Sequence, residues 1–126
     1  SCDPKLLSES RRPPGHGGAP EERSTNITRE MLRAKVHRIT VTECDVEYEG
    51  SLTLDRDLMD ACGMVAFERI DVYDVDNASR FSTYLIEGPR GSGACCVNGA
   101  AARLVKVGYN VIIAASAPHR ADHFGI

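Results

Sequence analysis

The sequence predicts a mainly β protein, a small β-barrel with short helices. Short apolar–polar alternations follow one another closely along the chain, and turns rich in Gly, Asn and Asp separate them. Little of the sequence shows the apolar spacing of a helix. The chain has 126 residues, of which 42% are hydrophobic, so we expect one modest core and a single folded domain.

Residues 1–26 differ from the rest because proline, glycine and mixed charges dominate them. We expect a disordered N-terminal arm there and a barrel domain over 27–126. The five cysteines are odd in number and contain no C-x-x-C pair, which is typical of reduced thiols in a cytoplasmic protein. A net charge of −3 without a basic stripe predicts no nucleic-acid partner. No apolar run approaches a membrane span, and no cluster indicates a metal site.

The first predicted strand covers 31–41, where apolar residues alternate and the phase slips at Arg38, as at a β-bulge. This alternation places Lys35 and His37 on one face. A strand over 44–48 and another over 52–54 flank the Gly50–Ser51 step.

Asp55 is a suitable N-cap for a short helix that ends before Gly63. A hairpin follows, with strands over 70–75 and 80–86 and a turn at 76–79. After a loop at 88–93 we expect a strand over 94–97, a tight turn over 98–102 and a strand over 111–115. Beyond that strand we expect no comparable strand, so that the C-terminal part of the barrel is abbreviated.

The step from Gly50 to Ser51 can carry chemistry of its own. A serine hydroxyl can attack the carbonyl carbon of the preceding residue and turn the amide into an ester. Elimination then releases the upstream piece and leaves dehydroalanine, which hydrolyses to a pyruvoyl group and ammonia. Glycine before the serine suits a strained backbone. Because Gly-Ser is also an ordinary turn dipeptide, the surrounding residues must decide between these interpretations.

Several ordered motifs accompany this step: Lys35-Val36-His37-Arg38, Tyr48-Glu49-Gly50-Ser51, Arg80-Phe81-Ser82-Thr83-Tyr84 and Asn98-Gly99-Ala100-Ala101-Ala102. Together they resemble the aspartate 1-decarboxylase family over about Thr28 to Ala115. The resemblance implies a double-psi β-barrel, assembled as a homotetramer with active sites between neighbouring subunits. It also implies decarboxylation of L-aspartate to β-alanine and CO2 for pantothenate and coenzyme A synthesis. The cofactor would be a pyruvoyl group made from Ser51, which forms a Schiff base with the substrate amine.

The resemblance assigns roles to the matching residues. Tyr84 is the proton donor to the carbanion, and Thr83 orients the Gly50 carbonyl during self-cleavage. Cations for the dianionic substrate come from Arg80 and Lys35, with His37 beside them. The pocket is lined by Asn98 and by the Gly99, Ala100 and Ala101 backbone. Simple alternation puts Thr83 and Tyr84 on opposite faces, so either the strand bends or the pair serves different sites.

Two alternatives remain at the level of sequence. The chain can be an uncleaved, non-catalytic barrel that acts as a binding or regulatory subunit, or it can decarboxylate another acidic amino acid such as glutamate. A separate maturation factor can also assist the cleavage, as in some relatives.

Overall fold

A computed structural model describes residues 27–120, and the arm expected over 1–26 lies outside them. The chain divides into two compact units. The first is Leu32–Ser116, and the second comprises the residues before and after it. The barrel belongs to the first unit. Of the second unit, 27–31 and 117–120 are described, and they include the outer ends of the first and last strands.

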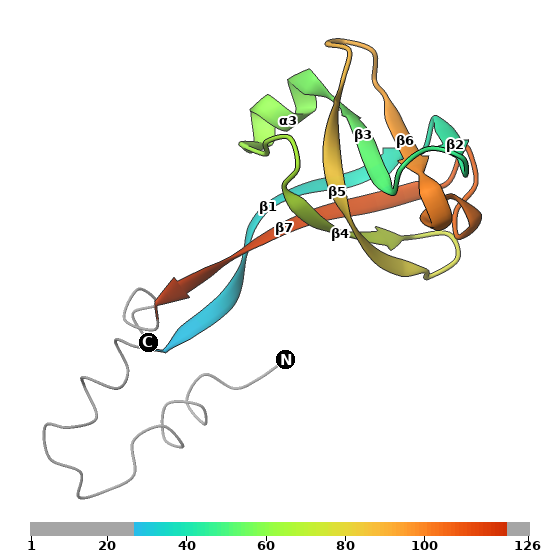
Figure 1. Ribbon diagram of the computed structural model, residues 1–126. Coiled ribbons are helices and arrows are strands. Elements are labelled where there is room, and N and C mark those ends of the chain that lie inside the picture. The colour runs from blue at the N-terminus through green and yellow to red at the C-terminus, as the bar shows by residue number, and fades with distance from the viewer. Residues whose placement is uncertain (1–26, 121–126) are drawn as a thin grey trace, which may run out of the picture. The chain divides into compact units, whose positions relative to one another are not determined.

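Strands dominate the described chain, as Figure 1 shows. Their bounds are β1 (Thr28–Thr40), β2 (Glu43–Asp45), β3 (Ser51–Asp55), β4 (Arg69–Asp74), β5 (Arg80–Gly88), β6 (Cys95–Asn98) and β7 (Asn110–Arg120). The short helices are α3 (Arg56–Cys62) and the 3-10 turn η1 (Gly99–Arg103). Neither helix within 27–120 has the length and apolar character needed to cross a bilayer.

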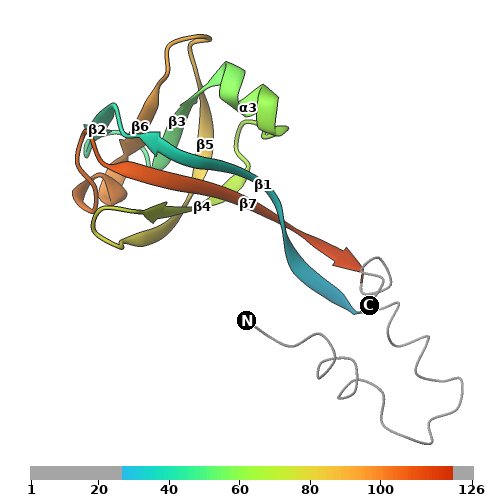
Figure 2. The ribbon, with the colours of Figure 1, turned by 180° about the vertical axis from the view of Figure 1, so that it is seen from behind.

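The strands form one sheet in the order β1-β7-β4-β5-β3-β6-β2. Pairing is mixed, since β3 runs parallel to β5 and β2 parallel to β6, whereas β3–β6, β4–β5 and β4–β7 are antiparallel. The Thr42 N–H, just after β1, donates to the Cys95 carbonyl of β6 over 2.9 Å, so the sheet curls back on itself. Figure 2 shows the same strands from behind. The predicted small barrel is confirmed, and its mixed pairing agrees with a double-psi topology.

The core lies inside this curled sheet, and every second side chain along the strands contributes to it. Leu52 and Leu54 of β3 face Leu85 of β5, and Val72 of β4 faces Ile113 of β7, all fully buried. Alternation therefore leaves the intervening residues on the outer face. Ser51 and Tyr84 are among these outer-face residues.

Local signals in the sequence are confirmed. Arg38 has φ 61°, and His37 and Arg38 are both exposed where the alternation slips. Asp55 caps α3 by accepting the Asp57 N–H over 2.9 Å, and Gly63 ends the helix with φ 69°. The β4–β5 hairpin forms with its turn held by the Asp74 carboxylate, which accepts the Asp76 N–H over 2.8 Å.

Several strand boundaries differ from expectation, and the ends of β2 and β7 have a physical explanation. Strand β2 ends at Asp45 because the Asp45 carboxylate accepts the Glu47 N–H over 3.1 Å and turns the chain. Strand β7 continues to Arg120, so the expectation of no strand after Ala115 is wrong for 116–120. Polar residues in this stretch, such as Ser116 and His119, concealed the strand because they interrupt its apolar run.

Candidate active site

Ser51 is the first residue of β3 and lies between strands β5 and β6. Its antiparallel partner on β6 is Asn98. On the other side Leu52 pairs with Leu85, and extending this parallel register by one residue places Tyr84 beside Ser51. Continuing across β5, Tyr84 pairs with Arg69 of β4. Residues far apart in the sequence therefore form one row across four strands, on the outer face of the sheet.

The Ser51 hydroxyl is held from both sides and is almost inaccessible to solvent. Ser51 Oγ donates to the Glu49 carbonyl over 2.8 Å, and Asn98 Nδ2 donates to Ser51 Oγ over 3.0 Å. Asn98 Nδ2 also donates to Thr53 Oγ1 over 3.0 Å. Ser51 and Asn98 are each 2% exposed. Buried polar groups need such partners, so this network fixes the hydroxyl next to the Gly50–Ser51 peptide bond.

Glycine is required at Gly99 rather than at Gly50. A Cβ atom on Gly99 would lie 2.7 Å from Gly50 Cα and 2.9 Å from Gly50 N, and Gly99 has φ +79°. A Cβ atom on Gly50 would meet nothing within 4 Å. Gly50 is also absent from the positive-φ residues of the described chain. The structure thus shows no left-handed backbone at Gly50, and the close approach of the two backbones depends on Gly99.

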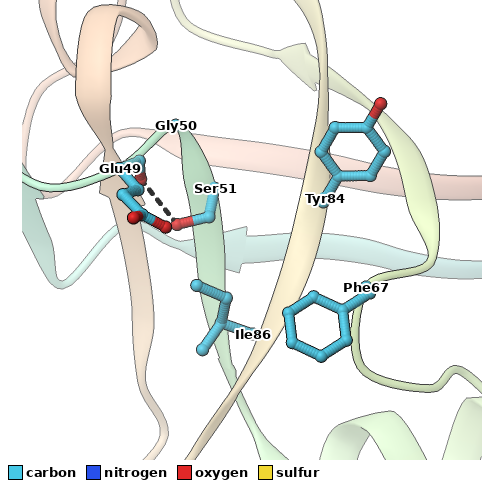
Figure 3. Close-up of a pocket in the computed structure, with 6 residues that line it drawn as sticks. All are labelled: Glu49, Gly50, Ser51, Phe67, Tyr84 and Ile86. Carbon is cyan, nitrogen blue, oxygen red and sulfur yellow. Dashed lines mark hydrogen bonds between the residues drawn. The ribbon is translucent and has the colours of Figure 1, made fainter.

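A hollow of about 350 Å³ opens beside Ser51. Its lining residues are Glu49, Gly50, Ser51, Phe67, Tyr84 and Ile86. Figure 3 shows Phe67 and Ile86 on one side of this hollow, with the Tyr84 hydroxyl pointing away from Ser51. Glu49 is the only charged residue of the six, so the lining from this chain is mostly apolar and carries one negative charge.

Thr83 and Tyr84 do lie on opposite faces of β5. Thr83 is 8% exposed and Tyr84 is 54% exposed. Both nevertheless line a second hollow of about 200 Å³, together with Arg69 and Ser82. Extending the Leu52–Leu85 register by two residues sets Thr83 opposite Gly50, which suits its expected role toward the Gly50 carbonyl.

The expected cations do not line the hollow at Ser51. The Arg80 guanidinium carbon stacks over the Tyr73 ring at 4.4 Å from its centroid, at the start of β5. Lys35 and His37 are exposed on β1. In the η1 turn Ala100 is exposed, and Ala101 packs against the core. Within this chain, therefore, Ser51, Tyr84, Asn98 and Gly99 come together, and the cations do not join them.

Three lining residues were not among the expected site residues: Glu49, Phe67 and Ile86. Ile86 follows Tyr84 by two positions on the same strand, so alternation could have found it. Phe67 could not be found this way, because it has φ 68° in an irregular segment before β4. Phe67 is also 77% exposed, which leaves its ring free to cover the hollow.

The thiols near the network stay protonated at neutral pH. Burial, with a smaller effect of Glu43 and Asp45, raises the pKa of Cys96 to about 11. Burial likewise raises the pKa of Cys95 to about 12. These raised pKa values disfavour a thiolate nucleophile in this region.

The fold and the site define a small β-barrel protein whose candidate centre is a buried serine directly after a glycine. Comparisons identify its family: the family model for aspartate decarboxylase matches residues 27–124, so the chain belongs to the aspartate decarboxylase family. A protein of Bordetella avium named aspartate 1-decarboxylase is 58% identical over 92 residues, which cover 73% of this chain and 75% of the relative. Relatives of the same name from Cupriavidus taiwanensis and Ralstonia pickettii are each 56% identical, with 73% of this chain and 77% of the relative covered.

Among solved structures, a computationally designed protein is 19% identical with a TM-score of 0.47, covering 64% of this chain and 96% of its own. That likeness is too low to define the fold, which the strand order and register define.

Proposed function

We propose that this protein decarboxylates L-aspartate to β-alanine and CO2 with a pyruvoyl group that it makes from Ser51. The observation that carries the proposal is the buried Ser51 hydroxyl, fixed next to the Gly50–Ser51 bond and beside a hollow. Membership of the aspartate decarboxylase family and the names of the relatives support the substrate. The product serves pantothenate and coenzyme A synthesis.

The self-cleavage needs no oxidant or metal to balance. Ser51 Oγ bonds to the Gly50 carbonyl carbon as the C–N bond breaks, which converts the amide to an ester and frees the Ser51 amine. Loss of the Ser51 α-proton then breaks the Cβ–Oγ bond, and residues 1–50 leave with a C-terminal carboxylate. The remaining dehydroalanine takes up water and loses ammonia, so that residues 51–126 begin with a pyruvoyl group.

The residues around Ser51 fit these steps. Asn98 Nδ2 lies 3.0 Å from Ser51 Oγ and can stabilise the negative charge that this oxygen gains when the Cβ–Oγ bond breaks. Thr83, opposite Gly50 in the register, is the candidate donor to the Gly50 carbonyl oxygen.

The hollow beside Ser51 suits the second reaction. The pyruvoyl group supplies a carbonyl for the substrate amine and accepts the electrons that remain when CO2 leaves. Phe67 and Ile86 provide an apolar wall, which disfavours the charged carboxylate of the substrate relative to CO2. Tyr84 lines the hollow and can deliver a proton to the former α-carbon once its ring rotates toward Ser51.

The negative charge of the hollow favours a site that a neighbouring copy of the chain completes. The hollow carries only the negative charge of Glu49, and a dianionic substrate needs cations. Lys35 and His37 are exposed, and Arg80 stands apart from this hollow in its own chain. We therefore propose that they meet the hollow of a neighbouring subunit in a homotetramer. A cytoplasmic location and help from a maturation factor stay predictions.

The direct test incubates the purified protein separately with L-aspartate and L-glutamate and quantifies the amino acids formed. We expect β-alanine from L-aspartate, and no comparable product from L-glutamate. A clear preference for glutamate would assign a different acidic substrate to the same chemistry. Absence of both products from fully cleaved protein would contradict the proposed enzyme. A chain that stays uncleaved and forms neither product would favour the uncleaved binding or regulatory barrel.

A further inference from the structure

The Asn98 side chain lies at the centre of the hydrogen-bond network around Ser51. Its terminal amide group can take two orientations, which differ by exchange of the nitrogen and the oxygen. In one orientation nitrogen faces Ser51 and Thr53, and in the other oxygen faces them. The Ser51 hydroxyl has a single proton, which it donates to the Glu49 carbonyl. Its oxygen therefore needs a donor from Asn98, and only the orientation with Nδ2 toward Ser51 supplies it.

Cys96 makes the contact that selects this orientation. Its Sγ atom lies 3.0 Å from Asn98 Oδ1 and donates to it. Cys96 precedes Asn98 by two positions on β6 and pairs with Thr53 of β3, so both side chains project from the same face. A thiol is a weak acceptor, and a flipped amide would set its own N–H groups against sulfur and leave Ser51 Oγ without a donor.

We propose that Cys96 is a positioning residue for self-cleavage, because its S–H group holds the Asn98 amide in the orientation that donates to Ser51. The proposal rests on the proposed function for its catalytic consequence, and on the hydrogen bonds of Asn98 for its structural part. Cys96 is not among the residues that line the hollow. Protonation of Cys96 at neutral pH, caused mainly by burial, supports its role as donor.

The test compares Cys96→Ser, which keeps a donor, with Cys96→Val and Cys96→Ala, which remove it. Cys44→Ala is the matched control, since Cys44 is also half-buried on a neighbouring strand and its Sγ contacts the Val105 carbonyl at 3.8 Å instead of Asn98. Intact-mass spectra during warm incubation give the rate of cleavage for each protein. We expect Cys96→Val and Cys96→Ala to cleave about tenfold more slowly than the wild type. We expect Cys96→Ser and Cys44→Ala to stay within about threefold of it.

A second readout separates the structural claim from the proposed function. The Asn98 side-chain NH₂ signals in 15N-labelled Ser51→Ala protein should change with Cys96→Val and be retained with Cys96→Ser. Equal cleavage rates and unchanged Asn98 signals in Cys96→Val would overturn the positioning role. If the wild type never cleaves, the proposed function fails, and the Asn98 signals still decide whether Cys96 orients the amide.

Discussion

A Cβ atom on Gly99 would lie 2.7 Å from Gly50 Cα, so the turn after β6 touches the backbone of the expected cleavage site directly. Both the distance and φ +79° exclude a larger residue at Gly99 without movement of the backbone. The η1 turn and the Gly50–Ser51 step are thereby coupled sterically, although they are distant in sequence.

Gly99→Ala should destabilise the protein more than Gly93→Ala. Both glycines have positive φ, at +79° and +67°, but a Cβ atom on Gly93 would meet nothing within 4 Å. Gly93→Ala therefore carries only the left-handed backbone cost of about 1–2 kcal/mol. Gly99→Ala adds the clash with Gly50 and should also slow cleavage. Urea unfolding of both variants measures the difference in stability. Equal stabilities would show that the Gly50 backbone moves away from the added Cβ atom at no cost in free energy.

Asp55 should contribute to acid stability. Hydrogen bonds from the N–H groups of Gly93, Asp57 and Gly91 to its carboxylate, with the charge of Arg90, lower its pKa below 3.8. The folded-state pKa lies below the unfolded one, so this contribution is present above the unfolded pKa and is lost as pH falls through the folded pKa.

Asp55→Asn should accordingly be less stable at pH 7 and should lose less further stability on acidification below pH of about 4. Urea midpoints measured between neutral and acid pH test this. If the urea midpoints of the wild type and Asp55→Asn fall in parallel as the pH is lowered, Asp55 does not contribute to acid stability.

Cys95 and Cys96 should resist alkylation in the folded protein. With the pKa of Cys96 raised to about 11 from 9.0, its thiolate fraction at pH 8 falls by about 100-fold, and Cys95 falls further. Iodoacetamide labelling followed by peptide mapping measures each rate against a free thiol. Labelling of Cys96 at the rate of the free thiol would contradict the raised pKa of this side chain.

Arg80→Lys should weaken substrate binding while leaving self-cleavage intact. The change keeps the charge but removes the planar fork that suits a carboxylate, so we expect KM for L-aspartate to rise about tenfold. Arg90→Lys is the control, because Arg90 binds the Asp57 and Asp60 carboxylates of α3. An unchanged KM in Arg80→Lys would exclude Arg80 from the substrate site.

The sequence predicted local features well and the site only in part. The Asp55 cap, the Gly63 terminus and the slip at Arg38 depend on neighbouring residues, so short patterns revealed them. The pairing of Ser51 with Asn98 spans 47 residues, and alternation alone does not set a register over that distance. Only the family resemblance brought these residues together in advance.

Other features of the site could not be read from patterns at all. Phe67 lines the hollow and has a left-handed backbone conformation. No pattern in the surrounding sequence predicts this conformation. A Cβ atom is excluded sterically at Gly99 and not at Gly50, because the restriction arises from contact between two turns that are distant in sequence. The cations are a different case, since a single chain leaves Lys35 and His37 exposed and not among the residues that line the hollow.

Intact-mass analysis of the purified protein under denaturing conditions shows whether the Gly50–Ser51 bond breaks. We expect two chains, residues 1–50 and 51–126, the second lighter than its unmodified sequence by the change from serine to a pyruvoyl group. Ser51→Ala should remain a single chain under the same conditions. A wild-type protein whose chain stays whole after prolonged warm incubation, or a cleaved and active Ser51→Ala variant, would rule out self-cleavage at Ser51.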